Sequence, residues 1–388
     1  MTVSGRAIGV VTRAEPVPGG GELTEARIVQ PMVMVHGTAW QGRVRAVATL
    51  NLEGQTIQSG ELAPGSWGEG FNDRRHPHTY AHELMVSVTD LLGKLDGPVR
   101  VSVSAGKGFA PFGSDDPMSR PAVRYPVNHH LAQILERAVV IAGVRAGPAV
   151  LEVGVFNGDE PERPGQWPNW DRFGDSWSAR LSVRPGRGME LSGSRAKVHS
   201  PEHRPGAGTD AWKWHLGARI ERPLGGGRLY ALGEWARTAE AFGFFVFRSV
   251  LLETAWSRGR HAPYYRFERS DRPEDLRTTD PFRSLRPHLE NSIAGTTRWT
   301  AHTVGYSVGL TSASRLDLRP FVEVAFGTMR NIDGGVFQPR VFYGRESFNT
   351  ISLGLKASWR LAGHRMGRYA GLLEDGPTRD EVHHHSGM

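Results

Sequence analysis

Histidines gather in the segment FNDRRHPHTYAHE, residues 71–83, which contains His76, His78 and His82 followed by Glu83. Imidazole nitrogens are good ligands for Zn²⁺ and Cu²⁺. On an extended chain His76 and His78 share one face, because side chains alternate between the two faces of a strand. The alternative is a polar loop whose histidines bind no metal. The segment therefore predicts a candidate metal site at His76, His78 and His82.

The rest of the sequence offers little for enzymatic chemistry. It contains no cysteine, which excludes disulfides, thiolate-ligated metals and thiol catalysis. There is no HExxH motif, and the serines and histidines form no defensible Ser–His–carboxylate triad. We therefore expect no cofactor and no enzymatic activity.

A second group of charged residues lies in APFGSDDPMSRPAVRYPVNHHLAQI, residues 110–134. Carboxylates and guanidinium groups on one loop set up a field across a narrow passage, and such a field sorts solutes by charge. The alternative is an ordinary surface loop. The candidate residues of this segment are Asp115, Asp116, Arg120, Arg124, His129 and His130.

The elements around these segments follow a period of two. In SFNTISLGLKASWRL, Ile351, Leu353 and Leu355 fall on one parity, while Ser352 and Lys356 fall on the other. This alternation is typical of a strand with one apolar and one polar face. The run of about eleven residues is longer than a common soluble strand and matches a tilted strand that crosses a bilayer. The pattern predicts about sixteen such strands between Gly5 and Leu361, and almost no helix.

The connections between these strands alternate between long and short. Long polar stretches such as 158–176, 270–299 and 330–347 fall at one end of the array, and tight turns such as 145–148 and 185–188 fall at the other. Transmembrane barrels have this asymmetry, with short periplasmic turns and long extracellular loops. The fold class expected is therefore all-β, a transmembrane antiparallel up-and-down barrel.

Basic residues recur on the polar parity of the predicted strands. Side chains of this kind that line a pore favour anions, and arginine binds phosphate through two hydrogen bonds. Glutamates on the same faces, among them Glu152, Glu221, Glu234 and Glu323, neutralise part of this charge. The formal net charge of +7 fits an anion preference, or lipopolysaccharide contact. The predicted pore-wall residues are Arg43, Arg45, Arg100, Arg180, Arg184, Lys213, Arg219 and Lys356.

In architecture, nearly the whole chain resembles a bacterial outer-membrane porin of the sixteen-strand type, and it is most similar to the phosphate-selective porin O and P-like family. The resemblance implies that the connection after the fifth strand, about 110–134, folds inward as a constriction loop. It also implies a passive channel for small hydrophilic solutes, with anion or phosphate preference, in a trimer of Gram-negative outer membranes. The partners it implies are the lipid bilayer, lipopolysaccharide and small anionic solutes; no nucleic acid is expected.

Two terminal features complete the expectation. The start, MTVSGRAIGVVTRAEP, has no apolar signal-peptide core, so an outer-membrane location presumes that a signal peptide was removed. We expect residues 1–363 to form the barrel and residues 364–388 to form a periplasmic C-terminal tail. Two other functions stay open, namely a barrel that acts as a sleeve or partner for other envelope proteins, and an outer-membrane barrel enzyme.

Overall fold

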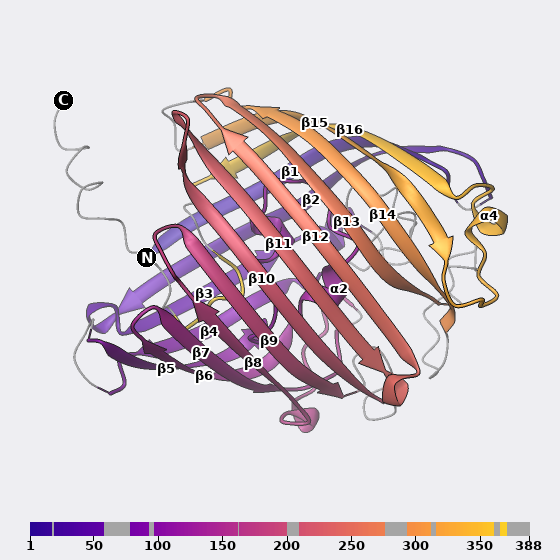
Figure 1. Ribbon diagram of the computed structural model, residues 1–388. Helices are drawn as coiled ribbons and strands as arrows, with labels where there is room; N and C mark the ends of the chain where they lie inside the picture. Colours follow the sequence, from indigo (N-terminus) through magenta and orange to yellow (C-terminus); the bar gives the residue numbers. More distant parts are fainter. Residues whose placement is uncertain are drawn as a thin grey trace.

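A closed antiparallel barrel of sixteen strands is the architecture of this chain, shown in a computed structural model (Figure 1). The structure describes residues 1–17, 19–57, 78–92, 97–161, 163–199, 209–275, 293–311, 316–360 and 365–370. Each strand pairs with its neighbours in sequence, and β1 pairs with β16 to close the wall. The predicted fold class is therefore confirmed. None of the helices in the described residues is long and apolar enough to cross a membrane.

The first eight strands are β1 (Thr2–Glu15), β2 (Leu23–Ala39), β3 (Val44–Asn51), β4 (Ala81–Thr89), β5 (Val99–Gly108), β6 (Arg137–Ala146), β7 (Ala149–Phe156) and β8 (Ser176–Val183). The other eight are β9 (Met189–His199), β10 (Asp210–Leu224), β11 (Gly227–Glu240), β12 (Phe245–Ser257), β13 (His261–Asp275), β14 (Ile293–Val308), β15 (Leu316–Asn331) and β16 (Ser347–Trp359). Within the described residues the helices are single turns: α1 (Glu53–Thr56), α2 (His129–Ala132), α4 (Pro339–Phe342), and the 3₁₀ turns η1 (Trp40–Gly42), η2 (Pro117–Ser119), η3 (Trp170–Arg172) and η4 (Ala241–Gly243).

On most strands the apolar parity faces outward, while β1 and β2 also turn apolar residues such as Ile8 and Met34 inward. On β16, Ile351 and Leu353 are 48% and 59% exposed, while Thr350 and Ser352 are buried inside the barrel. The same alternation holds on β5, where Val99 and Val103 are exposed and Ser102 is buried. A barrel with apolar residues outside and polar residues inside is the reverse of a water-soluble sheet protein, and it suits a wall that faces lipid.

The ends of the barrel differ, as Figure 1 shows with short turns at the upper left and long connections at the lower right. Connections such as 147–148, 225–226 and 258–260 join strands at the short-turn end, where the N-terminus also lies. The long-loop end holds connections such as 52–80 and 109–136, with the four-residue link 241–244 as the exception.

Some strands run into stretches that the alternation assigned to connections. β13 extends to Asp275 and β14 begins at Ile293, both within the stretch 270–299, because polar residues there continue the pairing. In β12, Arg248 lies on the outward parity with Val250, and the pairing with β11 runs through it without a bulge. Arg248 lies near the long-loop end of its strand, where an outward charge costs little.

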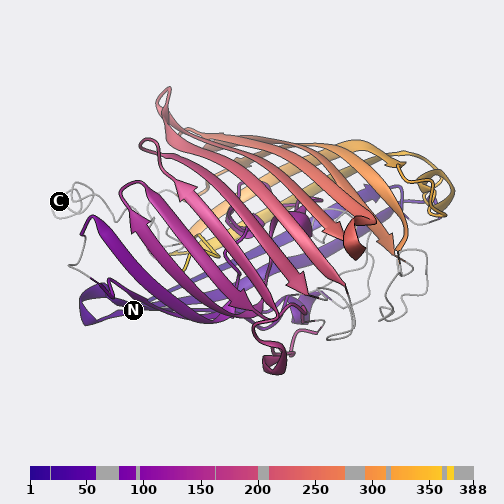
Figure 2. The same ribbon diagram turned by 60° about the horizontal axis from the view of Figure 1, so that its bottom comes forward.

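The interior is filled by chain rather than left as an empty cylinder. Figures 1 and 2 both show the segment after β5, with α2 in it, crossing the inside of the barrel. An apolar cluster joins this segment to β2, β4, β6, β7 and β9; it contains Phe109, Phe112, Met118, Tyr125 and Phe156, among others. A second apolar cluster around Trp299 and Tyr343 packs β14, β15 and β16 against the end of α4.

Candidate functional site

Residues 109–136, here called the inner loop, run inside the barrel and are almost entirely buried. Gly113 permits one sharp bend, with φ of 74° and a position where a Cβ would lie 1.7 Å from the carbonyl oxygen of Ala132. Asp116 caps the 3₁₀ turn η2, accepting a hydrogen bond from the Met118 amide at 2.7 Å. The bend and the cap fix the path of the loop across the lumen.

Carboxylates on the barrel wall hold one side of the inner loop. Arg120 Nη1 donates to Glu234 Oε2 at 2.9 Å, and Arg124 Nη2 donates to Glu268 Oε1 at 2.8 Å. Glu268 also accepts from the backbone amide of Val127 at 2.6 Å. These glutamates come from β11 and β13, so the loop arginines are paired with the wall rather than with the aspartates of the same loop.

Cations on the wall hold the backbone of the same loop. Lys356 Nζ donates to the carbonyl of Pro121 at 2.6 Å, and Arg266 Nη1 donates to the carbonyl of Arg124 at 2.6 Å. Lys213 Nζ donates to the carbonyl of His130. Buried charges are costly unless they are paired, and these contacts satisfy them while they fix the loop.

A short C-terminal segment, residues 365–370, also packs inside the barrel. Arg365 Nε donates to Asp115 Oδ1 at 2.8 Å, and its Nη1 donates to Glu190 Oε2 at 2.6 Å. Arg368 pairs with Glu190 at 2.9 Å. At its end, Tyr369 Oη donates to Glu83 at 2.7 Å. The segment is thus bound to the inner loop and to β9 and β4.

This position differs from the periplasmic tail expected for residues 364–388. Two arginines and a tyrosine in RMGRY complement acidic groups of the interior, so residues 365–370 lie against the inner loop instead of extending into solvent. Residues 371–388 lie outside the described part of the chain. The pKa of Asp115 reflects the contact: burial alone would raise it, but the charges of Arg365, Arg219 and Arg368 outweigh burial and hold it well below its usual range.

Several of the predicted pore-wall cations are paired with carboxylates. Arg100 contacts Asp90, Arg180 contacts Glu152 at 2.7 Å, and Arg219 lies 3.2 Å from Asp115. Arg43, at the start of β3, is exposed; Arg45 and Arg184 are partly exposed near the short-turn end. Sequence reasoning missed the partners that come from distant strands or from the tail: Glu190, Glu253, Arg266, Glu268, Arg365 and Arg368.

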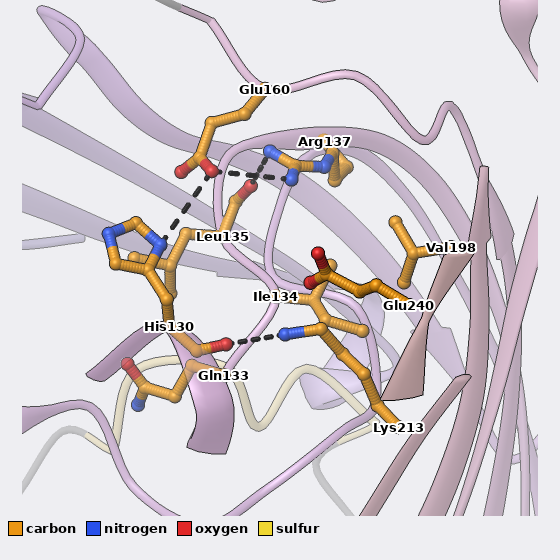
Figure 3. Close-up of a pocket in the computed structure, with 9 residues that line it drawn as sticks. All are labelled: His130, Gln133, Ile134, Leu135, Arg137, Glu160, Val198, Lys213 and Glu240. Carbon is orange, nitrogen blue, oxygen red and sulfur yellow. Dashed lines mark hydrogen bonds and ion pairs between the residues drawn. The ribbon is translucent and has the colours of Figure 1, made fainter. Parts of the chain in front are cut away.

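The predicted histidines of the inner loop lie at its far end. His129 stacks on the ring of Tyr125, with centroids 5.1 Å apart. His130 lines a small polar pocket of about 20 Å³ between the loop and the wall, shown in Figure 3. In that pocket Glu160 lies 3.8 Å from His130 Nδ1 and 3.5 Å from Arg137 Nη2.

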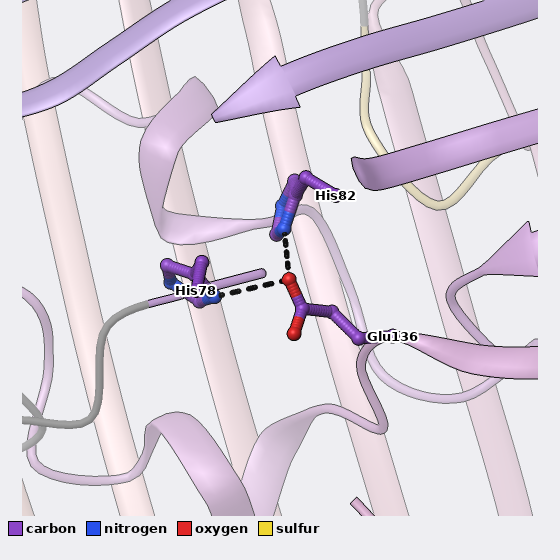
Figure 4. A group of neighbouring side chains, drawn as sticks. All are labelled: His78, His82 and Glu136. Atoms are coloured by element: carbon purple, nitrogen blue, oxygen red, sulfur yellow. Dashed lines mark hydrogen bonds and ion pairs between the residues drawn. The ribbon is translucent and has the colours of Figure 1, made fainter. Parts of the chain in front are cut away.

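Two of the three histidines predicted as metal ligands come together with a glutamate. His82 Nδ1 lies 2.7 Å from Glu136 Oε1, and His78 Nδ1 lies 3.7 Å from the same oxygen (Figure 4). His76 lies outside the described residues. Burial alone would lower the pKa of His78, but the hydrogen bond to Glu136 and the charges of Glu53, Glu136 and Asp116 outweigh it and raise the pKa to about 10.

Comparisons with known proteins give a likeness of fold. No family model matches the sequence, and no curated protein matches it either. Among solved structures, an anion-selective porin from Comamonas acidovorans has a TM-score of 0.55 at 13% identity, covering 92% of this chain and 99% of that chain. OmpT, an outer membrane protein of Vibrio cholerae, in its trimer form, has a TM-score of 0.50 at 11% identity, covering 92% and 98%. At these identities the likeness shows a shared barrel fold.

Proposed function

We propose that this chain is an outer-membrane channel for passive diffusion of small hydrophilic solutes, with a modest preference for anions. The observation that carries the proposal is a closed barrel, apolar outside and charged inside, with the loop after β5 folded into the lumen. A lumen narrowed in this way selects by size and charge, which is the work of a diffusion channel.

The inner wall is polar, as the wall of a diffusion channel is expected to be. Hydroxyl-bearing side chains point to the inside of the barrel from six strands, namely Ser102, Ser178, Thr238, Ser249, Ser270 and Thr303.

The modest size of the proposed anion preference follows from pairing. Several arginines of the interior are bound to carboxylates, as in Arg120–Glu234 and Arg180–Glu152, while Lys213 and Lys356 donate to backbone carbonyls. An arginine already bound to a carboxylate is a poor phosphate ligand, because its donors are engaged. We therefore propose a weak preference for anions in general and no dedicated phosphate site.

The other two functions find less support. A sleeve needs a wide free lumen, whereas the inner loop and the C-terminal segment fill this one. One G-x-S-x-G match does occur in the sequence, at 305–309, but its serine, Ser307, lies within strand β14 and not on a strand-to-helix turn. Four imidazoles that lie beside carboxylates, those of His78, His82, His199 and His215, make no hydrogen bond to a serine hydroxyl within the part of the chain that the structure describes, so they form no Ser–His–carboxylate triad there.

A liposome-swelling assay tests the proposal. Liposomes that contain the refolded barrel are expected to swell in a small neutral sugar, and faster in a sugar acid than in an amino sugar of the same size. Unfolded protein in the same lipid is the control. Swelling no faster than this control would contradict the proposed channel. Faster entry of the amino sugar than of the sugar acid would contradict only the proposed anion preference.

A trimer is also part of the proposal. It is supported by the trimer form named for the V. cholerae barrel and by a shallow apolar groove on the outer face of β1, β2 and β16, lined by Val11, Ile28 and Leu353. Light scattering of the detergent-solubilised protein measures the mass: three chains support the trimer, and one chain contradicts it.

A further inference from the structure

We propose that His78, His82 and Glu136 bind a divalent transition-metal ion such as Zn²⁺ inside the barrel. The three residues come from separate parts of the chain. His78 and His82 flank the start of β4, and Glu136 ends the inner loop just before β6. Their side chains point toward one another in Figure 4. A metal there would tie the wall to the end of the inner loop.

The ligand atoms are spaced for a small metal ion. All three lie within 4.8 Å of one another. Zinc bonds of about 2.0–2.2 Å in a tetrahedron separate ligand atoms by roughly 3.3 Å. The distances of 2.7 and 3.7 Å from Glu136 Oε1 to His82 Nδ1 and His78 Nδ1 bracket that value. The two imidazoles would have to approach each other by up to about 1.5 Å to complete the tetrahedral geometry, because the widest separation in the group is 4.8 Å.

The surroundings favour a cation and orient the ligands. Glu53 and Asp116 add negative charge near the histidines. Thr79 donates to Glu136 through its amide at 3.0 Å and its hydroxyl at 3.1 Å, which fixes the carboxylate. Lys107 donates to Thr79 Oγ1. Outer contacts of this kind orient metal ligands.

The site is closed to solvent. His82 is 0% exposed and its Nδ1 faces Glu136, so a metal bound between them would be held by buried groups. His199 offers a contrast: it pairs with Asp210 at 2.9 Å and is partly exposed, with no second histidine beside it.

Cobalt titration of the refolded barrel tests the site at neutral pH. The wild type is expected to show the visible absorption bands of tetrahedral Co²⁺ at one equivalent, and Zn²⁺ should displace them. Glu136→Gln keeps the shape of the site and should weaken binding at least about tenfold, while the matched control His199→Asn should bind as the wild type does. Heat-modifiable migration on a gel verifies that each variant is folded.

Two results would overturn the metal site. One is the absence of Co²⁺ and Zn²⁺ binding by the folded wild type at about a hundred micromolar, well above the range of built zinc sites. The other is an unchanged affinity in folded Glu136→Gln and His82→Gln. Neither result depends on conductance, so the metal-site proposal can be contradicted while the channel proposal stands, and the reverse.

A different observation carries a second inference: we infer that an arginine row on the outer face of β9–β15 binds the phosphate groups of lipopolysaccharide. Cross-strand pairing aligns Arg195 with Trp214, Trp214 with Arg237, and Arg237 with Arg248. The same row continues through Asp271 to Arg298 and Arg330. All lie on the outward parity, toward the long-loop end of their strands.

The charges of this row need an anionic partner. Arg237 and Arg248 are directly opposite, and like charges in such a pair destabilise a sheet. Asp271 is the only acid in the row, and it accepts from Arg298 at 2.7 Å. Trp214 lies 4.6 Å from the guanidinium of Arg237, an arrangement suited to the interface of a bilayer. Phosphates of an outer-leaflet lipid at that depth would neutralise the excess charge.

This second inference rests on the proposed outer-membrane location, and vesicle binding tests it apart from conductance. The refolded protein is expected to show a higher thermal midpoint in vesicles with lipopolysaccharide than with dephosphorylated lipopolysaccharide. Arg237→Gln/Arg248→Gln should remove most of that difference, and Arg187→Gln in a short turn should keep it. An equal midpoint in both vesicles would overturn the inference; a rise with millimolar inorganic phosphate alone would assign the row to a free anion and also overturn it.

Discussion

Replacing Arg365 by alanine is expected to release the C-terminal segment from the inner loop. Arg365 bonds both Asp115 and Glu190, and its side chain is only 17% exposed. Breaking a buried ion pair by removing one partner costs about 3–5 kcal/mol. We take the lower end, about 3 kcal/mol, because Arg219 and Arg368 remain beside the two acids. A change of this size lowers the ratio of docked to undocked segment about a hundredfold.

Single-channel recording in a planar bilayer measures this ratio. The segment narrows the lumen when docked, so the wild type should dwell in a low-conductance state and the Arg365→Ala variant in a higher one. Arg345→Ala is the matched control. Arg345 pairs with Glu15 at the exposed long-loop end, where an ion pair is worth about 0–1 kcal/mol, and it does not touch the segment.

The reasoning would be refuted if the Arg365→Ala variant and the wild type had the same ratio of dwell times in the low- and high-conductance states. That result would mean that the contacts of Arg365 do not determine the position of the C-terminal segment. A higher conductance in both Arg365→Ala and Arg345→Ala would also count against it, because the effect would then not be specific to the lumen.

The remaining predictions concern the inner loop and its contact with the C-terminal segment. Gly113→Ala should expose the loop to protease in the folded barrel, because the Cβ would meet a backbone oxygen at 1.7 Å, whereas Gly147→Ala, also at positive φ but with open space, should not. Glu268→Gln should lower the free energy of unfolding, measured by urea titration, by about 3 kcal/mol, because Arg124 loses a buried charge partner. A decrease of less than about 1 kcal/mol would contradict this prediction. In bilayer recordings the docked state of the C-terminal segment should persist from pH 8 to about pH 4. The contact lowers the pKa of Asp115, so the ionised carboxylate stabilises docking fully above its unfolded pKa near 3.9. This stabilisation is lost only as the pH falls through the lower pKa of the folded state. Release of the segment near pH 6 would show that another group controls it.

The wall of the barrel could be predicted from the sequence because its signal is local. Alternation in β16 places Ile351 and Leu353 on one face, and no distant residue is needed to see it. The sorting of long and short connections then gives the closed antiparallel topology. Only strand ends were missed, because polar residues at the rim continue the pairing without continuing the pattern, as in β13.

The interior could not be predicted in the same way, because its contacts join residues far apart. The partner of Arg120 is Glu234 and that of Asp115 is Arg365, and nothing in the local sequence links them. The histidine segment gave His78 and His82, while the third group beside them, Glu136, comes from the end of the inner loop. The motif RMGRY after the last strand was the one available signal for the C-terminal segment.

The most direct test of the central claim is the single-channel conductance of the refolded wild type, with reversal potentials in a KCl gradient. We predict discrete current steps that are small for a barrel of sixteen strands, because the inner loop and the C-terminal segment occupy much of the lumen. The reversal potential should be shifted slightly toward the equilibrium potential of chloride. A folded, heat-modifiable barrel that conducts no current, with or without the Arg365→Ala change, would contradict the channel.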